Sequence, residues 1–406
     1  MHIGHFLYHY PQAGGTTAAV RGISRALARI GHKVTIYCCT QANWISNEDA
    51  ERFSELRVVG FHQRRTHRFL APSELRARLK RNQDGVHLLV IHGMLNPANA
   101  AVAHAARRGG IPYVVCPHGA YHPEMSGKHR LRKAIYGILY ERPMLSAALA
   151  IQVLSADHIK LLADYGVRVP AFVVPNGFDP SEIPTLDLDK VTSSAGCRNE
   201  IPRFAYLGRI DKHTKGLDLL LRAISLGISQ KSLSSAVRLD LVGPDWGDQA
   251  NLTRLAKRLG VAEHTRFCGP VDEHGRWHTI ASSDVLILPS RHDGFGLAVL
   301  EAMIAAKPVI VSEAAGISTW VRRAGCGFIV EPTSESICSG LVKALESRAQ
   351  WRAMGEKGRD CAYRHLTWQK VAQQASQCYE AVLSGPRYFG SAGFASVEDV
   401  GRAEVP

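Results

Sequence analysis

Short apolar runs rich in β-branched residues alternate with longer stretches of helical spacing along the whole chain. Residues 86–92, VHLLVIH, and 112–118, PYVVCPH, are typical of buried strands. The segment between them carries alanine and valine at helical intervals and ends on Gly109-Gly110, as helices often do. Strands that alternate with helices in this way predict βαβ units and a mostly parallel sheet. The sequence therefore predicts an α/β fold.

The pattern forms two series, and a chain of 406 residues exceeds the size at which one core keeps growing. Strands are expected at 1–9, 32–39, 86–92, 112–118, 150–155 and 171–176, and then at 203–210, 238–244, 265–271, 284–290 and 308–313. We expect two Rossmann-like α/β/α domains with a cleft between them. The expected limits are a first domain 1–178, a linker 179–200, a second domain 201–368, a helix 369–385 that packs back toward the first domain, and a loose tail 386–406.

Cysteine usage and hydropathy predict the compartment. The nine cysteines are scattered, with only Cys38 and Cys39 adjacent, so neither a disulfide framework nor zinc-like spacing is present. The N-terminus lacks the pattern of a signal peptide, and no apolar run reaches the roughly 18 residues of a membrane span. We expect a cytoplasmic protein, with a peripheral position on the inner membrane as an extension of that expectation.

The net charge of +13 is concentrated in the first half. Residues 1–178 hold 22 Lys and Arg against 10 Asp and Glu, a balance of +12, whereas the remainder holds 27 against 26. This asymmetry indicates a polyanion or an anionic membrane facing the first half, although solvated basic faces would produce it too. A nucleic-acid-binding protein is disfavoured, because the sequence has no zinc-finger spacing, no RNA-recognition signature and no interleaving of basic and aromatic residues.

Two candidate sites follow strands of the first half. Gly14 and Gly15 come between a strand and a helix, where backbone N–H groups suit a phosphate, although a plain tight turn would use the same residues. The GxGxxG pattern and the acidic residue after the second strand are missing, which argues against NAD. His118 ends a strand, so its imidazole is expected at the ligand-binding edge of the sheet or, as the alternative, in a structural loop.

Two cations follow the first strand of the second half. Arg209 comes just after the strand, and Lys215 precedes a helix that begins near Gly216. Both can point at one diphosphate, and together with the helix N-terminus they could stabilise a diphosphate leaving group without a metal. Solvated surface residues are the alternative.

The stretch SRHDGFGLAVLEAM carries two acids around a glycine loop. Asp293 and Glu301 lie eight residues apart, with a strand before them and a helix after. Glycines let backbone N–H groups approach a sugar or phosphate closely. Asp293 can accept hydrogen bonds from sugar hydroxyls and Glu301 from a ribose, whereas an N-cap and an ordinary helical acid would leave the loop unexplained. The loop between them consists of Gly294, Phe295, Gly296 and Leu297.

These motifs together resemble the retaining GT-B glycosyltransferases of family 4 over nearly the whole chain. The acid-x7-acid element appears as DGFGL followed by LEAM and KPVI, and GRIDKHTKG, VVPNGFD, LVGP, FCGPV and the early AGG loop occur in the family's order. The resemblance implies a metal-independent, retaining hexosyltransferase that needs no cofactor beyond a UDP- or GDP-sugar. The family has Glu where this chain has Asp293, which leaves the donor sugar open.

The resemblance also implies roles for single residues. Arg209 and Lys215 would bind the donor diphosphate and Glu301 its ribose. Asp293 and the backbone of 295–297 would hold the transferred sugar, and His118 would lie beside the reacting carbon. Gly15 resembles the glycine that closes over the phosphate, and Asn176 resembles a residue at the cleft between the domains. The Asp187-Leu188-Asp189 triplet matches a metal-binding DxD formally, but it falls in the variable linker.

In this family the first domain takes the acceptor, and that domain here is the basic half. Apolar residues follow a basic cluster at helical spacing in SGKHRLRKAIYGILYERPM, which suits an anionic membrane or, as the alternative, a helix whose apolar side faces the core. We expect a lipid-linked saccharide acceptor in polysaccharide or lipopolysaccharide assembly. A nucleotide-sugar epimerase or hydrolase of the same architecture is the rival interpretation. The basic cluster consists of Lys128, Arg130, Arg132 and Lys133.

Overall fold

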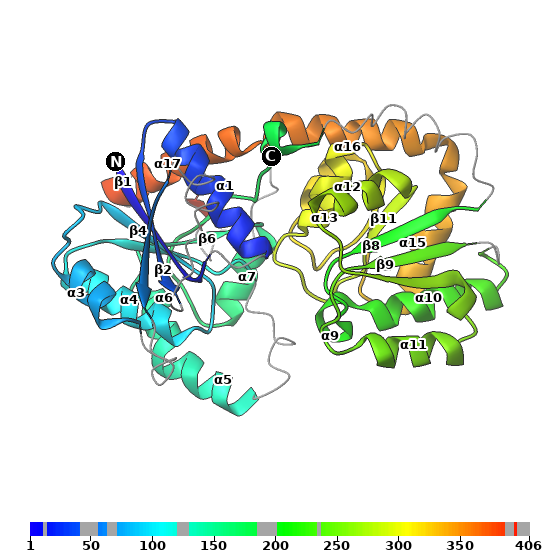
Figure 1. Cartoon of the computed structure of the whole chain (residues 1–406), viewed down its shortest axis with the longest axis horizontal. Helices are drawn as coiled ribbons and strands as arrows, with labels where there is room; N and C mark the ends of the chain where they lie inside the picture. The colour runs from blue at the N-terminus through cyan, green and yellow to red at the C-terminus, as the bar shows by residue number, and fades with distance from the viewer. Residues whose placement is uncertain are drawn as a thin grey trace. The chain divides into compact units, whose positions relative to one another are not determined.

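The computed structural model describes residues 1–10, 14–40, 56–62, 71–119, 130–184, 201–233, 237–385 and 394–395. The chain divides into two compact units (Figure 1). Unit 1 comprises Met1–Asp179 and Leu366–Pro406, and unit 2 comprises Pro180–His365. The chain therefore passes between the units twice.

Unit 1 is built on one sheet whose strands run in the order β14-β7-β6-β5-β4-β1-β2-β3. All neighbouring strands pair in parallel except β14, which pairs antiparallel with β7. All five residues of β4 are buried, as expected when helices cover both faces of a parallel sheet. The strands are β1 (His2–His9), β2 (Lys33–Thr40), β3 (Arg57–His62), β4 (Leu88–His92), β5 (Tyr113–Cys116), β6 (Ala150–Val153), β7 (Ala171–Val173) and β14 (Phe394–Ala395).

Local signals set the helix limits of unit 1. In α4, the Asn96 side chain accepts a hydrogen bond from the Ala98 N–H, Pro97 occupies the first turn, and the helix ends before Gly109. The described helical segments of this unit are α1 (Gly15–Arg29), α3 (Ser73–Lys80), α4 (Pro97–Arg108), α5 (Arg130–Tyr136), the π-helical segment η3 (Gly137–Glu141), α6 (Arg142–Ser146), α7 (Asp157–Asp164) and α17 (Trp368–Ser384).

Unit 2 is built on a second, fully parallel sheet in the order β10-β9-β8-β11-β12-β13. Its strands are β8 (Arg203–Leu207), β9 (Arg238–Val242), β10 (Thr265–Gly269), β11 (Val285–Leu288), β12 (Val309–Ser312) and β13 (Gly327–Val330). Its described helices are η4 (Pro180–Glu182), α9 (Lys212–Lys215), α10 (Leu217–Ser229), α11 (Gln249–Arg258), η5 (Ala262–His264), α12 (Glu273–Ser282), α13 (Leu297–Ile304), α14 (Ser318–Ala324), α15 (Ser334–Glu346), η6 (Arg348–Gln350) and α16 (Trp351–His365). Figure 1 shows α10 and α11 on one side of this sheet and α12 and α13 on the other.

Helix α17 lies in unit 1 because its first residue is fixed there. A Cβ on Gly22 of α1 would meet the Trp368 ring at 2.2 Å, and one on Gly177 would meet it at 2.9 Å. The indole therefore occupies the space that two glycines leave. Backbone hydrogen bonds from the Phe178 N–H to the Leu366 carbonyl and from the Trp368 N–H to the Phe178 carbonyl join the two chain passages between the units.

The expected α/β fold of two Rossmann-like units is confirmed, with differences in detail. Strands β3 and β13 were not among the expected strands, and β3 has only one buried residue among its six, so it lacks an apolar run to reveal it. The tail after residue 385 was expected to have no regular structure, yet Phe394–Ala395 pair with β7. Residues 187–189, with the formal DxD, lie outside the described residues.

Candidate functional site

The loops after β8 and β11 meet at the carboxyl edge of the sheet in unit 2, because these two strands are neighbours. The Lys215 ammonium donates a hydrogen bond to Asp293 Oδ2 across 2.5 Å, and both side chains are only 14–15% exposed. The His292 N–H also donates to the Thr214 carbonyl at 3.2 Å. The two loops predicted to bind one donor thus form a single structure.

Helix α9 places Lys215 through an N-cap at its other end. The Asp211 carboxylate accepts hydrogen bonds from the N–H groups of His213 and Thr214. The next residue, Gly216, has a φ of 64°, and a Cβ there would lie 2.2 Å from the Pro289 carbonyl oxygen. Only glycine fits at this point, where the chain turns from α9 into α10 against the β11 loop.

Asp293 is held as a carboxylate by its surroundings. Burial alone would raise the pKa of its carboxyl, but the charge and hydrogen bond of Lys215 and the backbone N–H of Phe295 outweigh it, so the pKa is lowered. The Phe295 N–H donates to Asp293 Oδ1 at 3.2 Å. Backbone pairing with Ala315 fixes the residue further. Asp293 therefore presents a negative charge at this edge.

The glycine loop brings backbone donors to the same place. Gly296 precedes α13 with a φ of 100°, and a Cβ there would lie 2.9 Å from side-chain atoms of Ile317 and Leu288. Leu297 begins the helix, so the first N–H groups of α13 have no partner within it. Phe295 is buried and its carbonyl accepts a hydrogen bond from the Ile317 N–H at 2.7 Å, while Gly294 is partly buried. The loop is a suitable site for an anion or a polar sugar.

Glu301 lies within α13 and pairs with an arginine of α12. Arg276 Nη1 lies 3.2 Å from Glu301 Oε1. Burial raises the pKa of Glu301 to about 7, with the charge of Arg276 acting to lower it and that of Glu273 to raise it. Glu301 thus changes its ionisation near neutral pH, which is the behaviour of a group in a binding site more often than on a surface.

Arg209 follows β8 and lies beside an exposed indole. Its guanidinium carbon lies 4.8 Å from the centre of the Trp246 ring, a cation–π distance. Trp246 is 62% exposed, and its backbone N–H donates to the Ile210 carbonyl at 3.1 Å. The Tyr206 hydroxyl donates to the Arg209 carbonyl at 2.7 Å. Both the backbone and the side chain of Arg209 are therefore held at the edge of unit 2.

In unit 1, the predicted glycines stand at the start of α1. Gly14 is its N-cap with a φ of 156°, and Gly15 is its first helical residue. A Cβ on Gly14 would contact nothing within 4 Å, so open space adjoins the helix N-terminus. Asn176 follows β7 and is buried, with an exposure of 6%. It directly precedes Gly177, the glycine that packs against the Trp368 ring. The structure thus places these residues at loops that follow strands.

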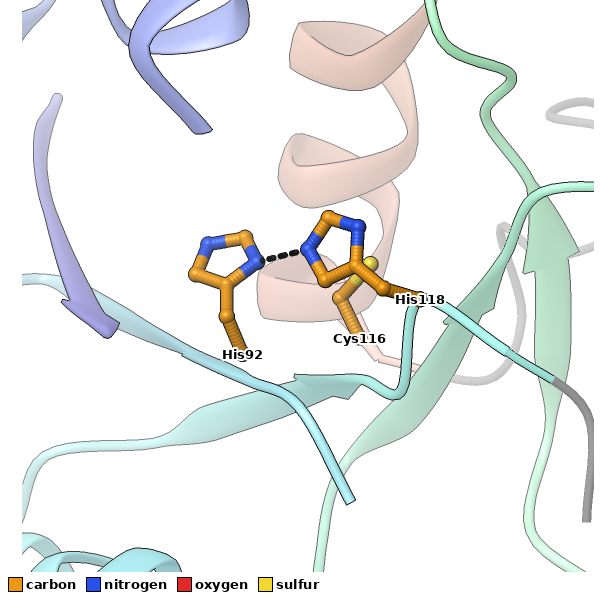
Figure 2. A group of neighbouring side chains, drawn as sticks. All are labelled: His92, Cys116 and His118. Atoms are coloured by element: carbon orange, nitrogen blue, oxygen red, sulfur yellow. Dashed lines mark hydrogen bonds between the residues drawn. The ribbon is translucent and has the colours of Figure 1, made fainter. Parts of the chain in front are cut away.

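His118 follows β5 with a φ of 57°, a left-handed conformation that is costly for a non-glycine residue and is concentrated at functional sites. Figure 2 shows its ring directed at that of His92, and His118 Nε2 lies 2.7 Å from His92 Nδ1. His92 Nε2 lies 2.8 Å from His5 Nδ1. The candidate catalytic histidine is thus the end of a three-residue chain.

The cluster in Figure 2 also has metal-ligating chemistry, since ligand atoms of His92, Cys116 and His118 all lie within 4.8 Å of one another. Both ring nitrogens of His92 already form hydrogen bonds, one with His5 and one with His118, so a metal bound to His92 would displace one of them. Burial also raises the pKa of the Cys116 thiol to about 12, and a thiol must lose its proton to bind a metal. The arrangement favours a hydrogen-bonded chain over a metal site.

The basic cluster expected at the acceptor surface is described only in part. Lys128 lies outside the described residues, and for Arg130 only the backbone, in α5, is described. Arg132 is exposed and Lys133 is partly buried. Beyond them, the apolar side chains of Ile135, Ile138, Leu139 and Tyr140 are all exposed. These four side chains therefore do not face the core, whereas the alternative interpretation predicted that they would.

Several neighbours of the candidate residues carry no signal in the sequence. Arg276 and Trp246 had no motif to mark them, and their contacts depend on which loops meet at the edge of unit 2. His5 and His92 lie in strands that are distant in sequence, and only the order β5-β4-β1 places them beside His118. Only His92, the last residue of its strand, offered a signal of the same kind as His118, because His5 lies in the middle of β1.

Two family models match the chain, one in each half. The model of glycosyl transferases group 1 matches residues 193–360, and the model of glycosyltransferase family 4 matches residues 13–182. With two α/β units, each built on a mainly parallel sheet, the fold is that of the GT-B class. The chain belongs to the group 1 glycosyltransferase family, which confirms the resemblance found in the sequence.

Curated relatives agree with this family. A phosphatidyl-myo-inositol mannosyltransferase of Mycobacterium leprae is 32% identical over 217 residues, which is 51% of this chain and 55% of the relative. The chain thus matches about half the length of that relative. A D-inositol 3-phosphate glycosyltransferase of Frankia alni is 25% identical over 92% of this chain and 95% of the relative.

Solved structures share the fold at low sequence identity. Sucrose-phosphate synthase from Thermosynechococcus elongatus superposes with a TM-score of 0.73 at 19% identity, over 94% of this chain and 99% of the other. HepE from Anabaena, solved in complex with UDP-glucose, superposes with a TM-score of 0.70 at 19% identity, over 94% and 99%. WaaG, a glycosyltransferase involved in lipopolysaccharide biosynthesis, has a TM-score of 0.65 at 18% identity, over 93% and 99%.

Proposed function

We propose that this chain is a retaining hexosyltransferase that moves a sugar from a UDP- or GDP-sugar to an acceptor hydroxyl. The observation that carries the proposal is the Lys215–Asp293 pair, which joins a cationic loop and a glycine loop at one sheet edge. Unit 2 has a candidate group for each part of the donor. Arg209 and Lys215 face the diphosphate, Asp293 the sugar, and Glu301 the ribose.

The proposed reaction needs stabilisation of negative charge above all. The bond between the anomeric carbon and the diphosphate oxygen breaks, and its electron pair stays on that oxygen. Arg209 and Lys215 stabilise the charge that develops there, without a metal, through charge-assisted hydrogen bonds. An ammonium carries three N–H donors, and Asp293 takes one of them.

The acceptor oxygen then forms its bond to the anomeric carbon on the face that the diphosphate leaves, which retains the configuration. Its proton goes to the leaving phosphate oxygen, so no enzyme nucleophile is required. His118 contributes a polar contact to the reacting sugar or phosphate. Transfer also requires that water be excluded from the bound sugar, because hydrolysis of the donor competes.

For the acceptor we propose a lipid-linked saccharide, reached at an anionic membrane surface on unit 1. No helix in the described residues is both long and apolar enough to span a membrane. Ile138 and Leu139, in η3, are 58% and 60% exposed, and Arg132 is exposed one to two turns earlier. Exposed apolar side chains next to basic ones suit the interface of an anionic bilayer. The named function of the WaaG neighbour is a parallel for such an acceptor.

The donor half of the proposal is tested by incubating the protein with a panel of UDP- and GDP-sugars and a lipid-linked acceptor extract. One donor should be consumed only when an acceptor is present, with an anomeric configuration in the product that matches the donor by NMR. Conversion of the donor without an acceptor would instead establish an epimerase or a hydrolase. Inversion of the configuration would refute the mechanism.

The membrane half is tested by flotation with vesicles containing anionic phospholipid at low salt. The double variant Ile138→Ser, Leu139→Ser should bind at least tenfold more weakly, since each buried apolar side chain contributes about 1.5–3 kcal/mol. Leu383→Ser is the control, because Leu383 is also partly exposed but lies in α17. Equal vesicle binding by the double variant and the control would exclude this surface.

A further inference from the structure

The imidazoles of His5, His92 and His118 form a continuous hydrogen-bonded chain that runs from the middle of β1, through the end of β4, to the residue after the β5 strand end in unit 1. His5 Nδ1 lies 2.8 Å from His92 Nε2, and His92 Nδ1 lies 2.7 Å from His118 Nε2. The ring centres are 5.1 Å and 4.9 Å apart. The three residues come from β1, β4 and the end of β5, which are adjacent in the sheet. The order of the strands therefore places the three imidazoles within hydrogen-bonding distance of one another.

All three rings are neutral at physiological pH. Burial lowers the pKa of His5 to about 3 and that of His118 to about 4. The pKa of His92 is lowered well below its usual value by burial and by its two histidine neighbours. A neutral imidazole has one N–H donor and one nitrogen acceptor. Each ring thus brings a single proton to the chain.

The protons shared in these hydrogen bonds couple the tautomers of the three rings. Each nitrogen–nitrogen hydrogen bond contains one proton, and His92 takes part in two of them. If His92 carries its proton on Nδ1, it donates to His118 and accepts from His5, so all three rings are protonated on Nδ1. If His92 carries its proton on Nε2, all three rings are protonated on Nε2. The chain has only these two states, and the tautomer of His118 depends on His5.

The two states differ at His5, the end of the hydrogen-bonded chain that is farther from His118. Nε2 of His5 is buried and has no hydrogen-bond partner among the described residues. In one state this nitrogen is an N–H donor without an acceptor, and in the other it is a bare lone pair. Buried N–H groups without partners are rarer in proteins than under-satisfied acceptors. The lone pair on His5 Nε2, and with it the Nδ1-protonated state, is favoured.

We propose that His5 and His92 are positioning residues that fix His118 as a neutral hydrogen-bond donor through its Nδ1–H. This nitrogen of His118 has no partner within the described part of the chain and is available to an oxygen of a substrate. The inference rests on the proposed sugar transfer and adds to it. His118 donates to an oxygen atom of the sugar or the phosphate and does not serve as the base that removes the acceptor proton.

The direct test is the tautomeric state of the three rings in the full-length protein without substrate. Histidine labelled with ¹⁵N in the ring distinguishes protonated from bare nitrogens in long-range ¹H–¹⁵N correlation spectra. Single variants such as His118→Asn assign the signals. We expect His5, His92 and His118 all to be protonated on Nδ1. Protonation of His118 on Nε2, or a doubly protonated ring in the chain at pH 7, would overturn the proposal.

Two substitutions at His5 are expected to have opposite effects on the direction of the hydrogen bonds: one reverses it and the other preserves it. The carboxylate in His5→Asp can only accept, so His92 would donate through Nε2 and His118 would become protonated on Nε2. The amide in His5→Asn can donate to His92 Nε2 and preserve the native direction. We expect kcat to fall about 10²-fold in His5→Asp, the size of effect seen when one preorganised donor is lost. It should stay within a few-fold in His5→Asn.

The two variants and the spectra separate the possible failures. Equal loss of kcat in both variants, with native tautomers at His118, would show that His5 has only a packing role and would overturn the proposal. If His5→Asp does not fold, the spectra of the native protein and of His5→Asn still decide the tautomer. If the native spectra match but no sugar is transferred, the proposed function fails while the assignment of the chain stands.

Discussion

The Lys215 ammonium and the Asp293 carboxylate form an ion pair across 2.5 Å, although 78 residues separate them in the sequence. Each side chain is about one-seventh exposed, so neither charge is well solvated. The pair holds the cation that we assign to the donor diphosphate within reach of the acid that we assign to the donor sugar. Removing either partner leaves the other as a buried, uncompensated charge.

Lys215→Met should therefore impair both activity and stability. We expect a loss of about 3 kcal/mol in the free energy of unfolding, the lower end for breaking a buried pair. The double variant Lys215→Met, Asp293→Asn should recover much of that stability but none of the activity. Urea unfolding and steady-state kinetics measure the two effects. Lys212→Met is the matched control, because Lys212 lies on the same helix, 3.7 Å from Asp248 and more exposed, and should cost at most about 1 kcal/mol.

The stability loss in Lys215→Met should depend on pH. The folded-state pKa of Asp293 is lowered below its ordinary value of 3.8, so its contribution is present above that pH and is lost as the pH falls through the folded value. The difference between native protein and variant is thus largest near neutral pH and shrinks in acid. A difference that does not change between pH 7 and pH 3 would show that the pair does not form.

Donor affinity should weaken below neutral pH because of Glu301. The pKa of this carboxyl is raised to about 7, chiefly by burial, and in the role that we propose the ionised form accepts hydrogen bonds from the ribose hydroxyls. The KM for the donor should therefore rise as the pH falls through 7. Glu301→Gln should have a higher KM that is nearly constant between pH 6 and pH 8. A constant KM in the native enzyme over this range would contradict the ribose assignment.

The same carboxyl has the opposite effect on stability. Its folded-state pKa lies above its ordinary value of 4.5, so the folded protein binds a proton that the unfolded chain has released between these values. The contribution of Glu301 to stability therefore falls as the pH rises from about 4.5 to 7. Glu301→Gln should lack this decline, which thermal unfolding at several pH values will measure.

Two glycines with similar backbone angles provide a matched test of the glycine loop. Gly296 and Gly247 have φ values of 100° and 96°, but a Cβ at Gly296 would press on Ile317 and Leu288, whereas one at Gly247 would contact nothing within 4 Å. Gly247→Ala should cost about 1–2 kcal/mol for the backbone alone. Gly296→Ala should cost about 1–3 kcal/mol more for crowding and should also lower kcat, because α13 is displaced. Equal costs would show that crowding at Gly296 is unimportant.

Trp246 should contribute to donor binding through Arg209. An exposed cation–π contact contributes about 0.5–1 kcal/mol, so Trp246→Ala should raise the KM for the donor about two- to fivefold with little change in kcat. Trp246→Phe keeps a ring and should lose less. Quenching of the Trp246 fluorescence by a bound nucleotide-sugar offers a readout independent of turnover. Unchanged KM in Trp246→Ala would mean that the indole does not orient Arg209.

The sequence was sufficient for the two α/β series and the family, because apolar runs and glycine loops are local signals, but not for β3, β13 and β14. The strand–loop–helix order around Gly216 and Gly296 follows from short patterns that need no tertiary information. Contacts such as Glu301 with Arg276 were not predictable, because they depend on which helices lie side by side. Nor could the burial of His5 be foreseen, since a histidine inside a strand has no pattern that distinguishes a solvated ring from one in a chain.

The claim that unit 2 binds a nucleotide-sugar is tested most directly by measuring the Kd of UDP- and GDP-sugars for the native protein, Lys215→Ala, Glu301→Ala and the control Lys212→Ala. We predict binding of one donor class by the native protein and by Lys212→Ala. Both Lys215→Ala and Glu301→Ala should bind it at least tenfold more weakly while unfolding in a single cooperative transition. Native affinity in Lys215→Ala and Glu301→Ala, or no binding of any nucleotide-sugar by the native protein, would contradict the assignment.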